Sequence, residues 1–127
     1  MRDYGPQGRP RRGWFTTDIW DGKKLVARFK YVLHYASHGE WERDGKRGFP
    51  PCYYIAYSDD YEELRALLNE YAENPSPLLE AHGKGSLDLC SAGSHGAGFT
   101  SIYINEDGSV KDTGIGAAGY GTDHLYD

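Results

Sequence analysis

The sequence has few of the residues that point to a secreted, membrane-bound or disulfide-stabilised protein. Its 127 residues include two cysteines and one methionine, and no apolar run is long enough to cross a bilayer. Cys52 and Cys90 are too few for a disulfide framework, so we expect two reduced thiols in or near the core. No apolar segment follows the basic N-terminus, as it would in a signal peptide. The sequence therefore predicts a soluble cytoplasmic protein that does not act at a membrane.

Several well-defined functional motifs are also missing. No Gly-Lys-Ser/Thr sequence closes a phosphate loop, and no Gly-x-Ser-x-Gly sequence marks a nucleophile elbow. His34 and His38 are four residues apart, a spacing that would let two imidazoles share a metal ion on a helix. However, Tyr35 follows His34, where a zincin helix has glutamate. We therefore expect both histidines to be solvent-exposed, and we predict neither a metal site nor a cofactor.

The charge is divided unevenly along the chain. Residues 1–48 carry eleven Lys and Arg against six Asp and Glu, whereas residues 49–127 carry three Lys and Arg against thirteen Asp and Glu. The two halves either attract each other within the fold or present separate basic and acidic surfaces. Residues 1–13 have the Gly, Pro and Arg composition of a flexible basic arm. Residues 14–127 are expected to form one domain, and the net charge of −5 makes direct nucleic-acid binding unfavourable.

The clearest structural signal runs from Pro51 to Pro75. The apolar run from Cys52 to Tyr57 predicts a buried strand inside a sheet. Ser58, Asp59 or Asp60 can cap a helix that then carries leucines on one face and carboxylates on the other. Asn74 and Pro75 end that helix.

The other expected elements complete a mixed fold. Apolar residues from Leu25 to Ala36 recur at helical spacing and predict a second helix over about 23–38. A polar loop is expected over 40–51 and a short helix over 78–82, while Glu106 to Ser109 form a hairpin turn. We predict an α+β fold in which two main helices pack on a mostly antiparallel sheet of about four or five strands. The expected strands are residues 14–20, 52–57, 87–90, 99–105 and 110–115.

The candidate partner-binding surface is the acidic side of the helix after Tyr57. Outward carboxylates could dock on a protein partner with a basic surface, although such a face is more commonly only solvated. Trp41 lies among cations and could contact the same kind of partner, or it could fold back over the core. The residues assigned to partner binding are Asp59, Asp60, Glu63, Glu70, Glu73 and Trp41.

The candidate ligand-binding segment is the Gly-rich stretch 91–98 together with the C-terminal end of the chain. Backbone N–H groups at closely spaced glycines can surround an anion, and Ser94 with His95 supplies a nucleophile and a base. A plain loop between two strands is the simpler explanation. The residues assigned to a small anionic ligand are Ser91, Ser94, His95, Gly96, Tyr120 and His124.

The sequence thus supports three hypotheses. The first is a small acidic, non-catalytic binding protein that inhibits or antagonises another macromolecule. The alternative is a small nucleotide- or phosphate-binding protein or enzyme that uses the loop 91–98. The third is a structural subunit that forms a homo-oligomer or joins a larger assembly.

Overall fold

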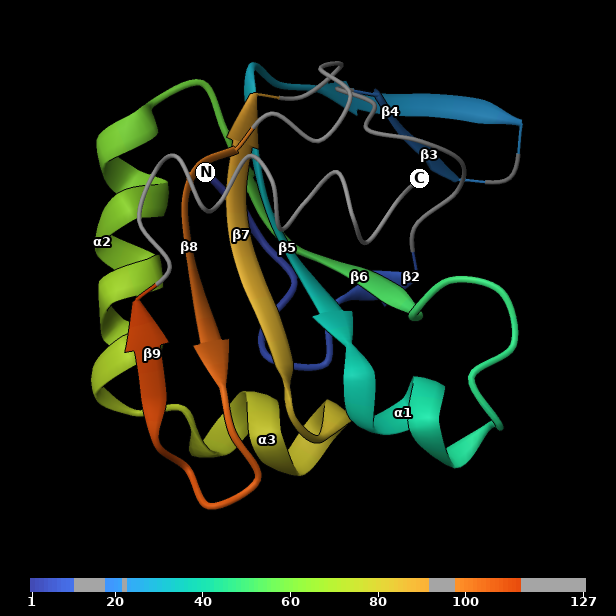
Figure 1. The fold of residues 1–127 in the computed structure, drawn as a ribbon. Coiled ribbons are helices and arrows are strands. Elements are labelled where there is room, and N and C mark those ends of the chain that lie inside the picture. Colours follow the sequence, from blue (N-terminus) through green and yellow to red (C-terminus); the bar gives the residue numbers. More distant parts are fainter. Residues whose placement is uncertain (11–17, 22, 92–97, 113–127) are drawn as a thin grey trace.

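The structure is a computed structural model that describes residues 1–10, 18–21, 23–91 and 98–112. Within these residues the chain forms three helices and nine strands (Figure 1). The helices are α1 (His38–Arg43), α2 (Tyr61–Glu73) and α3 (Ser76–His82). The strands are β1 (Arg2–Asp3), β2 (Arg9–Pro10), β3 (Asp18–Asp21), β4 (Lys24–Arg28), β5 (Tyr31–Ser37), β6 (Cys52–Ser58), β7 (Gly85–Ser91), β8 (Gly98–Ile104) and β9 (Val110–Asp112).

The strands form one large antiparallel sheet and one small ribbon. The order in the seven-stranded sheet is β1-β6-β5-β7-β8-β9, and β2 also pairs with β6. β3 and β4 form the separate two-stranded ribbon. The α+β fold expected from the sequence is therefore confirmed.

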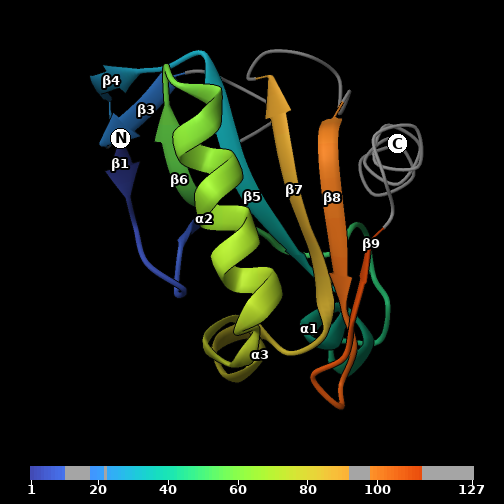
Figure 2. The same ribbon diagram turned by 90° about the vertical axis from the view of Figure 1, so that its left-hand side faces the viewer.

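The helix α2 covers one face of the sheet, as Figure 2 shows. Its buried residues are Leu64, Leu68 and Tyr71, which join the larger core cluster with side chains from β5, β6, β7 and β8. The sequence placed these residues on one helical face because they recur at intervals of three and four. Consistent with the predicted cap, the Asp60 carboxylate accepts a 3.0 Å hydrogen bond from the backbone N–H of Glu62.

The opposite face of the sheet carries a second core cluster, formed by Val32, Ala36, Tyr54, Tyr57 and Cys90. β5 contributes to both clusters, since Leu33 and Tyr35 belong to the first and Val32 and Ala36 to the second. A strand buried on both faces has no polar side, so its sequence is apolar almost throughout.

The predicted helix over 23–38 is wrong. This segment forms β4 and β5, and His34 lies fully buried in β5 rather than exposed on a helix. The run from Tyr31 to Ser37 contains β-branched and aromatic residues that favour a strand. The predicted loop over 40–51 also needs correction, because α1 occupies its beginning, with Ser37 accepting from the backbone N–H of Glu40 as the N-cap.

Residues 1–10 are part of the sheet and are not a separate arm. Arg2 and Asp3 pair with Tyr57 and Ala56, and Arg9 and Pro10 pair with Tyr54 and Tyr53. β6 therefore has neighbours on both sides, as its apolar sequence predicted. Residues 11–13 of the predicted arm lie outside the described residues.

The other predicted elements agree with the structure where it describes the chain, whereas His38, predicted to be exposed, is half-buried at the start of α1. α3, β7 and β8 lie at the expected positions, and β9 forms the start of the expected strand 110–115. The hairpin turn before β9 has Gly108 at φ +86°, which glycine adopts without the penalty that a side chain brings. Of the predicted strand 14–20, the structure describes Asp18 to Trp20, which belong to β3. No helix in the described part of the chain is both long enough and apolar enough to cross a membrane.

Candidate functional site

The acidic face predicted on α2 points to solvent. We call this set of six exposed carboxylates the acidic face. Because Leu64, Leu68 and Tyr71 hold the other side of the helix against the sheet, the carboxylates project away from it. The acidic face consists of Asp59, Asp60, Glu62, Glu63, Glu70 and Glu73.

Three of these carboxylates already have contacts within the chain. Asp59 accepts a 2.9 Å hydrogen bond from the backbone N–H of Lys30, and Asp60 caps the helix. Glu63 accepts from the Ser58 hydroxyl at 2.9 Å and lies 3.5 Å from the α-amino group of Met1. Each of the three therefore helps to fix the β6–α2 turn or the start of the chain.

The other three carboxylates have no such contact with the residues that the structure describes. Within the described residues, Glu62, Glu70 and Glu73 make no hydrogen bond or ion pair through their side chains. The only cation in α2 is Arg65, which is half-buried. These three side chains therefore leave negative charge on the surface that the described part of the chain does not neutralise.

Trp41 is half-buried and is held by its own loop. Its indole Nε1 donates to the backbone oxygen of Gly48 at 3.2 Å, and the Lys46 ammonium lies 6.0 Å from the ring centroid. The ring therefore closes the turn after α1, and it is distinct from the acidic face.

The predicted ligand-binding residues lie mostly beyond what the structure describes. Ser91 is the last residue of β7 and is half-buried. The other five, Ser94, His95, Gly96, Tyr120 and His124, lie outside the described residues. The small anionic ligand stays a prediction.

A buried polar cluster was not predicted. His34 in β5 and Asp88 in β7 are opposite each other in the sheet register, and Cys90 follows two positions later on the same side of β7. The imidazole Nε2 lies 3.3 Å from the Cys90 sulfur, and Nδ1 lies 3.7 Å from Oδ2 of Asp88. All three side chains are fully buried. We call His34, Asp88 and Cys90 the thiol cluster.

Only one of the two oxygens of the Asp88 carboxyl group in the thiol cluster accepts a hydrogen bond within the described residues. The Ser86 hydroxyl donates to Oδ1 of Asp88 at 2.8 Å, whereas Oδ2 has no hydrogen-bond partner within the described residues. Burial disfavours the charged form and raises the pKa of Asp88 to about 7, against the hydrogen bonds from Ser86 and Ser101 that lower it. The cluster therefore contains a carboxyl group that changes its charge near neutral pH.

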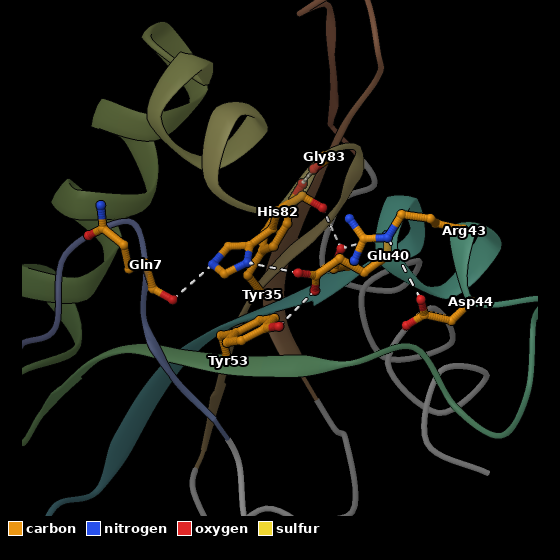
Figure 3. A network of polar contacts seen from close by, with 9 residues as sticks. Gln7, Tyr35, Glu40, Arg43, Asp44, Tyr53, His82 and Gly83 are labelled. Atoms are coloured by element: carbon orange, nitrogen blue, oxygen red, sulfur yellow. Dashed lines mark hydrogen bonds and ion pairs between the residues drawn. The ribbon is translucent and has the colours of Figure 1, made fainter.

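A second polar network, drawn in Figure 3, connects four segments of the chain. His82 Nε2 donates to the backbone oxygen of Gln7 at 2.9 Å, and its Nδ1 lies 3.8 Å from the Glu40 carboxylate. Tyr53 donates to Glu40 at 2.7 Å, and its ring stacks on His82 with centroids 3.9 Å apart. Burial and this hydrogen bond raise the pKa of Tyr53 to about 12. The network ties residues 1–10 to α1, α3 and β6.

A surface hollow of about 350 Å³ lies beside this network, between the N-terminal segment and α3. It is lined by Pro6, Gln7, Pro77, Glu80, Ala81 and His82. The imidazole of His82 is already engaged by Gln7 and Tyr53, whose contacts connect segments of the fold. We therefore assign no ligand to this hollow.

Comparison with known proteins gives no relative from which the role of these sites could be inferred. No protein-family model, curated protein or solved structure matches the chain. In the described ranges, His, Cys, Asp and Glu side chains form no group of three or more that could hold a metal ion. The geometry places an imidazole beside a thiol and a carboxyl group in the thiol cluster, and it places six exposed carboxylates in the acidic face.

Proposed function

We propose that the protein is a small acidic binding protein that docks on a basic surface of another macromolecule through the acidic face and antagonises it. The observation that supports this proposal is the outward projection of the α2 carboxylates. They stand on a helix that is fixed to the sheet by three buried side chains. A rigid, charged surface loses little conformational entropy when a partner binds.

The distribution of charge over α2 favours a cationic partner. Glu62, Glu70 and Glu73 are exposed and lie on a helix with a single cation. Clustered charges of one sign accelerate encounter with the opposite charge, and salt weakens this effect because it screens the attraction. We therefore expect the association rate to fall as the salt concentration rises.

The proposal includes a location in the cell, and two alternative functions stand beside it. A cytoplasmic location follows from the sequence expectation and would bring the protein to intracellular basic surfaces. The anion-binding loop 91–98 remains the second candidate function, and it rests on composition alone. If the protein forms a homo-oligomer, affinity capture would recover a second copy of the same chain as the partner.

The test is affinity capture of a partner by the intact protein, followed by binding measurements with that partner. The variant Glu70→Lys/Glu73→Lys reverses charge in the last turns of α2, where lysines suit the helix dipole and should leave the helix intact. We expect the variant to bind the captured partner about tenfold or more weakly than the unmodified chain. The partner's own activity should fall when the unmodified protein binds.

The matched control is Asp44→Lys/Glu106→Lys, which changes the net charge by the same amount at two exposed turns away from α2. It should bind as the unmodified chain does. Equal losses in both variants would mean that only net charge matters, and equal retention in both would remove the acidic face from the interface.

A further inference from the structure

The thiol cluster brings together an imidazole from β5 and a thiol and a carboxyl group from β7. The imidazole of His34 stands between the sulfur of Cys90, 3.3 Å from Nε2, and the carboxylate of Asp88, 3.7 Å from Nδ1. A nucleophile within reach of a base, with a third group beside that base, is the arrangement that activates cysteine and serine nucleophiles.

Irregular pairing occurs beside both His34 and Cys90. The β5–β6 register shifts between Leu33 and His34, and the β7–β8 register shifts between Leu89 and Cys90. Such bulges bend a strand and redirect its side chains, and they are enriched next to active sites. The two shifts therefore accompany the convergence of the imidazole and the thiol on the same face of the sheet.

A purely structural role explains the cluster poorly. Leu87 and Leu89 alternate with Ser86, Asp88 and Cys90 along β7, so the leucines serve the core below α2 and the polar residues face the other way. An apolar residue at position 88 would satisfy the second core cluster without the cost of burying a carboxylate. Oδ2 of Asp88 has no hydrogen-bond partner in the described chain and faces the imidazole. In its ionised form, this oxygen would stabilise the imidazolium that forms when His34 takes a proton.

We infer that Cys90 is an activated thiol that reacts with small neutral hydroperoxides, with His34 as its base and Asp88 as a positioning residue. His34 Nε2 takes the thiol proton, and the thiolate sulfur attacks one peroxide oxygen. The S–O bond forms as the O–O bond breaks, so the sulfur is oxidised to a sulfenic acid and the peroxide is reduced. The departing hydroxide takes the proton from the imidazolium and leaves as water.

The substrate class follows from burial. Cys90 is fully buried, so large or charged electrophiles have no access to the sulfur in the folded protein. Hydrogen peroxide is small and neutral, and it is the probe that the geometry favours.

The experiment exposes the intact, reduced protein to hydrogen peroxide for a set time, removes the peroxide with catalase, and then unfolds the protein in the presence of dimedone. Unfolding lets dimedone trap the sulfenic acid that formed at the buried sulfur in the folded protein, and mass spectrometry separates Cys90 from Cys52. Cys52 is the internal reference, because it is half-buried and its thiol donates to the backbone oxygen of Pro50 at 3.4 Å. We expect Cys90 to be trapped about tenfold faster than Cys52, since thiolate character controls cysteine reactivity. Exposure alone predicts the opposite order.

Two variants test the roles of the neighbours. In His34→Gln the Cys90 rate should fall at least to that of Cys52, while the Cys52 rate stays unchanged. In Asp88→Asn the oxidation rate of Cys90 should also fall. In the unmodified protein we expect this rate to increase from pH 6 to pH 8, and in Asp88→Asn we expect that increase to be lost. Circular dichroism checks that each variant is folded.

The comparison within the unmodified protein stands even if both variants fail to fold. If Cys90 is oxidised only when hydrogen peroxide is added to the unfolded protein, while Cys52 is oxidised in the native state, the thiol cluster is a structural feature and the inference is wrong.

Discussion

At the scale of single residues, Asp88 couples the stability of the protein to pH. Its carboxyl is fully buried between Ser86 on its own strand, His34 on β5 and Ser101 on β8, with Cys90 nearby. Burial raises its pKa from 3.8 to about 7, so the fold favours the protonated acid. A group that binds its proton more tightly in the folded state makes the folded state more stable at low pH.

We therefore expect Asp88 to make stability fall as the pH rises from about 4 to about 7. Below pH 4 the carboxyl is protonated in both states and its contribution is complete. Above pH 7 it is ionised in both states and the contribution is lost, with an upper limit on the order of 4 kcal/mol. Urea unfolding of the unmodified protein and of Asp88→Asn across this range measures the effect.

The Asn variant keeps the shape of the side chain and removes the titration. Its free energy of unfolding should change less between pH 4 and pH 7 than that of the unmodified chain. At pH 8 the variant should be at least as stable, because it buries no charge. Parallel pH profiles of the two proteins would show that Asp88 does not titrate in this window.

At the scale of elements, α2 combines a capped N-terminus with an exposed acidic face. Asp60 stands before its first turn and accepts from the backbone N–H of Glu62, and its negative charge also suits the helix N-terminus. Capping and charge are separate effects, and they can be measured separately at this one position.

Replacing Asp60 with alanine should lower the free energy of unfolding by about 1 kcal/mol, because an N–H of the first turn loses its acceptor. Asp60→Asn keeps a capping oxygen and removes the charge, so its stability should stay within about 0.5 kcal/mol of the unmodified protein. Thermal or urea unfolding at low ionic strength measures both. Equal losses in the two variants would mean that charge, and not the cap, stabilises the helix.

The contrast between α2 and β5 explains how much of the fold could be predicted. α2 has one buried and one exposed face, so its leucines and carboxylates separate at helical spacing and the sequence predicts it correctly. β5 is buried on both faces, so Val32, Leu33 and Ala36 show no alternation, and with Leu25 and Phe29 they mimic a helical stripe. Burial on both faces thus removed the period of two on which strand prediction depends.

The thiol cluster could not be found for a related reason. His34 and Cys90 are 56 residues apart, and only the register of β5 with β7 brings them together. One signal was available in β7, where Ser86, Asp88 and Cys90 alternate with leucines and predict a polar strip on one face. The residue opposite that strip is His34 on β5, and the sequence assigned the β5 segment to a helix. The exposure of the carboxylates of the acidic face followed from helical spacing alone, and their role in partner binding stays a prediction.

At the scale of the whole molecule, residues 1–10 protect one edge of the sheet. β1 and β2 pair with β6, and between them the backbone N–H of Tyr4 donates to Ile55 at 2.8 Å. The Gln7 contact with His82 holds the segment to α3 as well. Without these residues, β6 would present unpaired backbone groups, which promote association between sheet edges.

Deletion of residues 1–10 should therefore reduce stability by on the order of 3 kcal/mol, because several backbone hydrogen bonds to β6 are lost. It should also cause concentration-dependent self-association, which light scattering detects. Acetylation of the Met1 amino group is the matched control, since it removes the charge near Glu63 and leaves β1 and β2 in place. A truncated chain that stays monomeric and equally stable would contradict this role.

The position of β5 and β7 at the centre of the sheet also affects how quickly the protein can fold. α2 forms from neighbouring residues, but β5 meets β7 only after the chain between them has closed into a large loop, a step whose entropy cost slows folding. The sulfur of Cys90 gains its imidazole neighbour only when that pairing is complete. During synthesis or refolding, Cys90 therefore has no imidazole beside it until β5 has paired with β7.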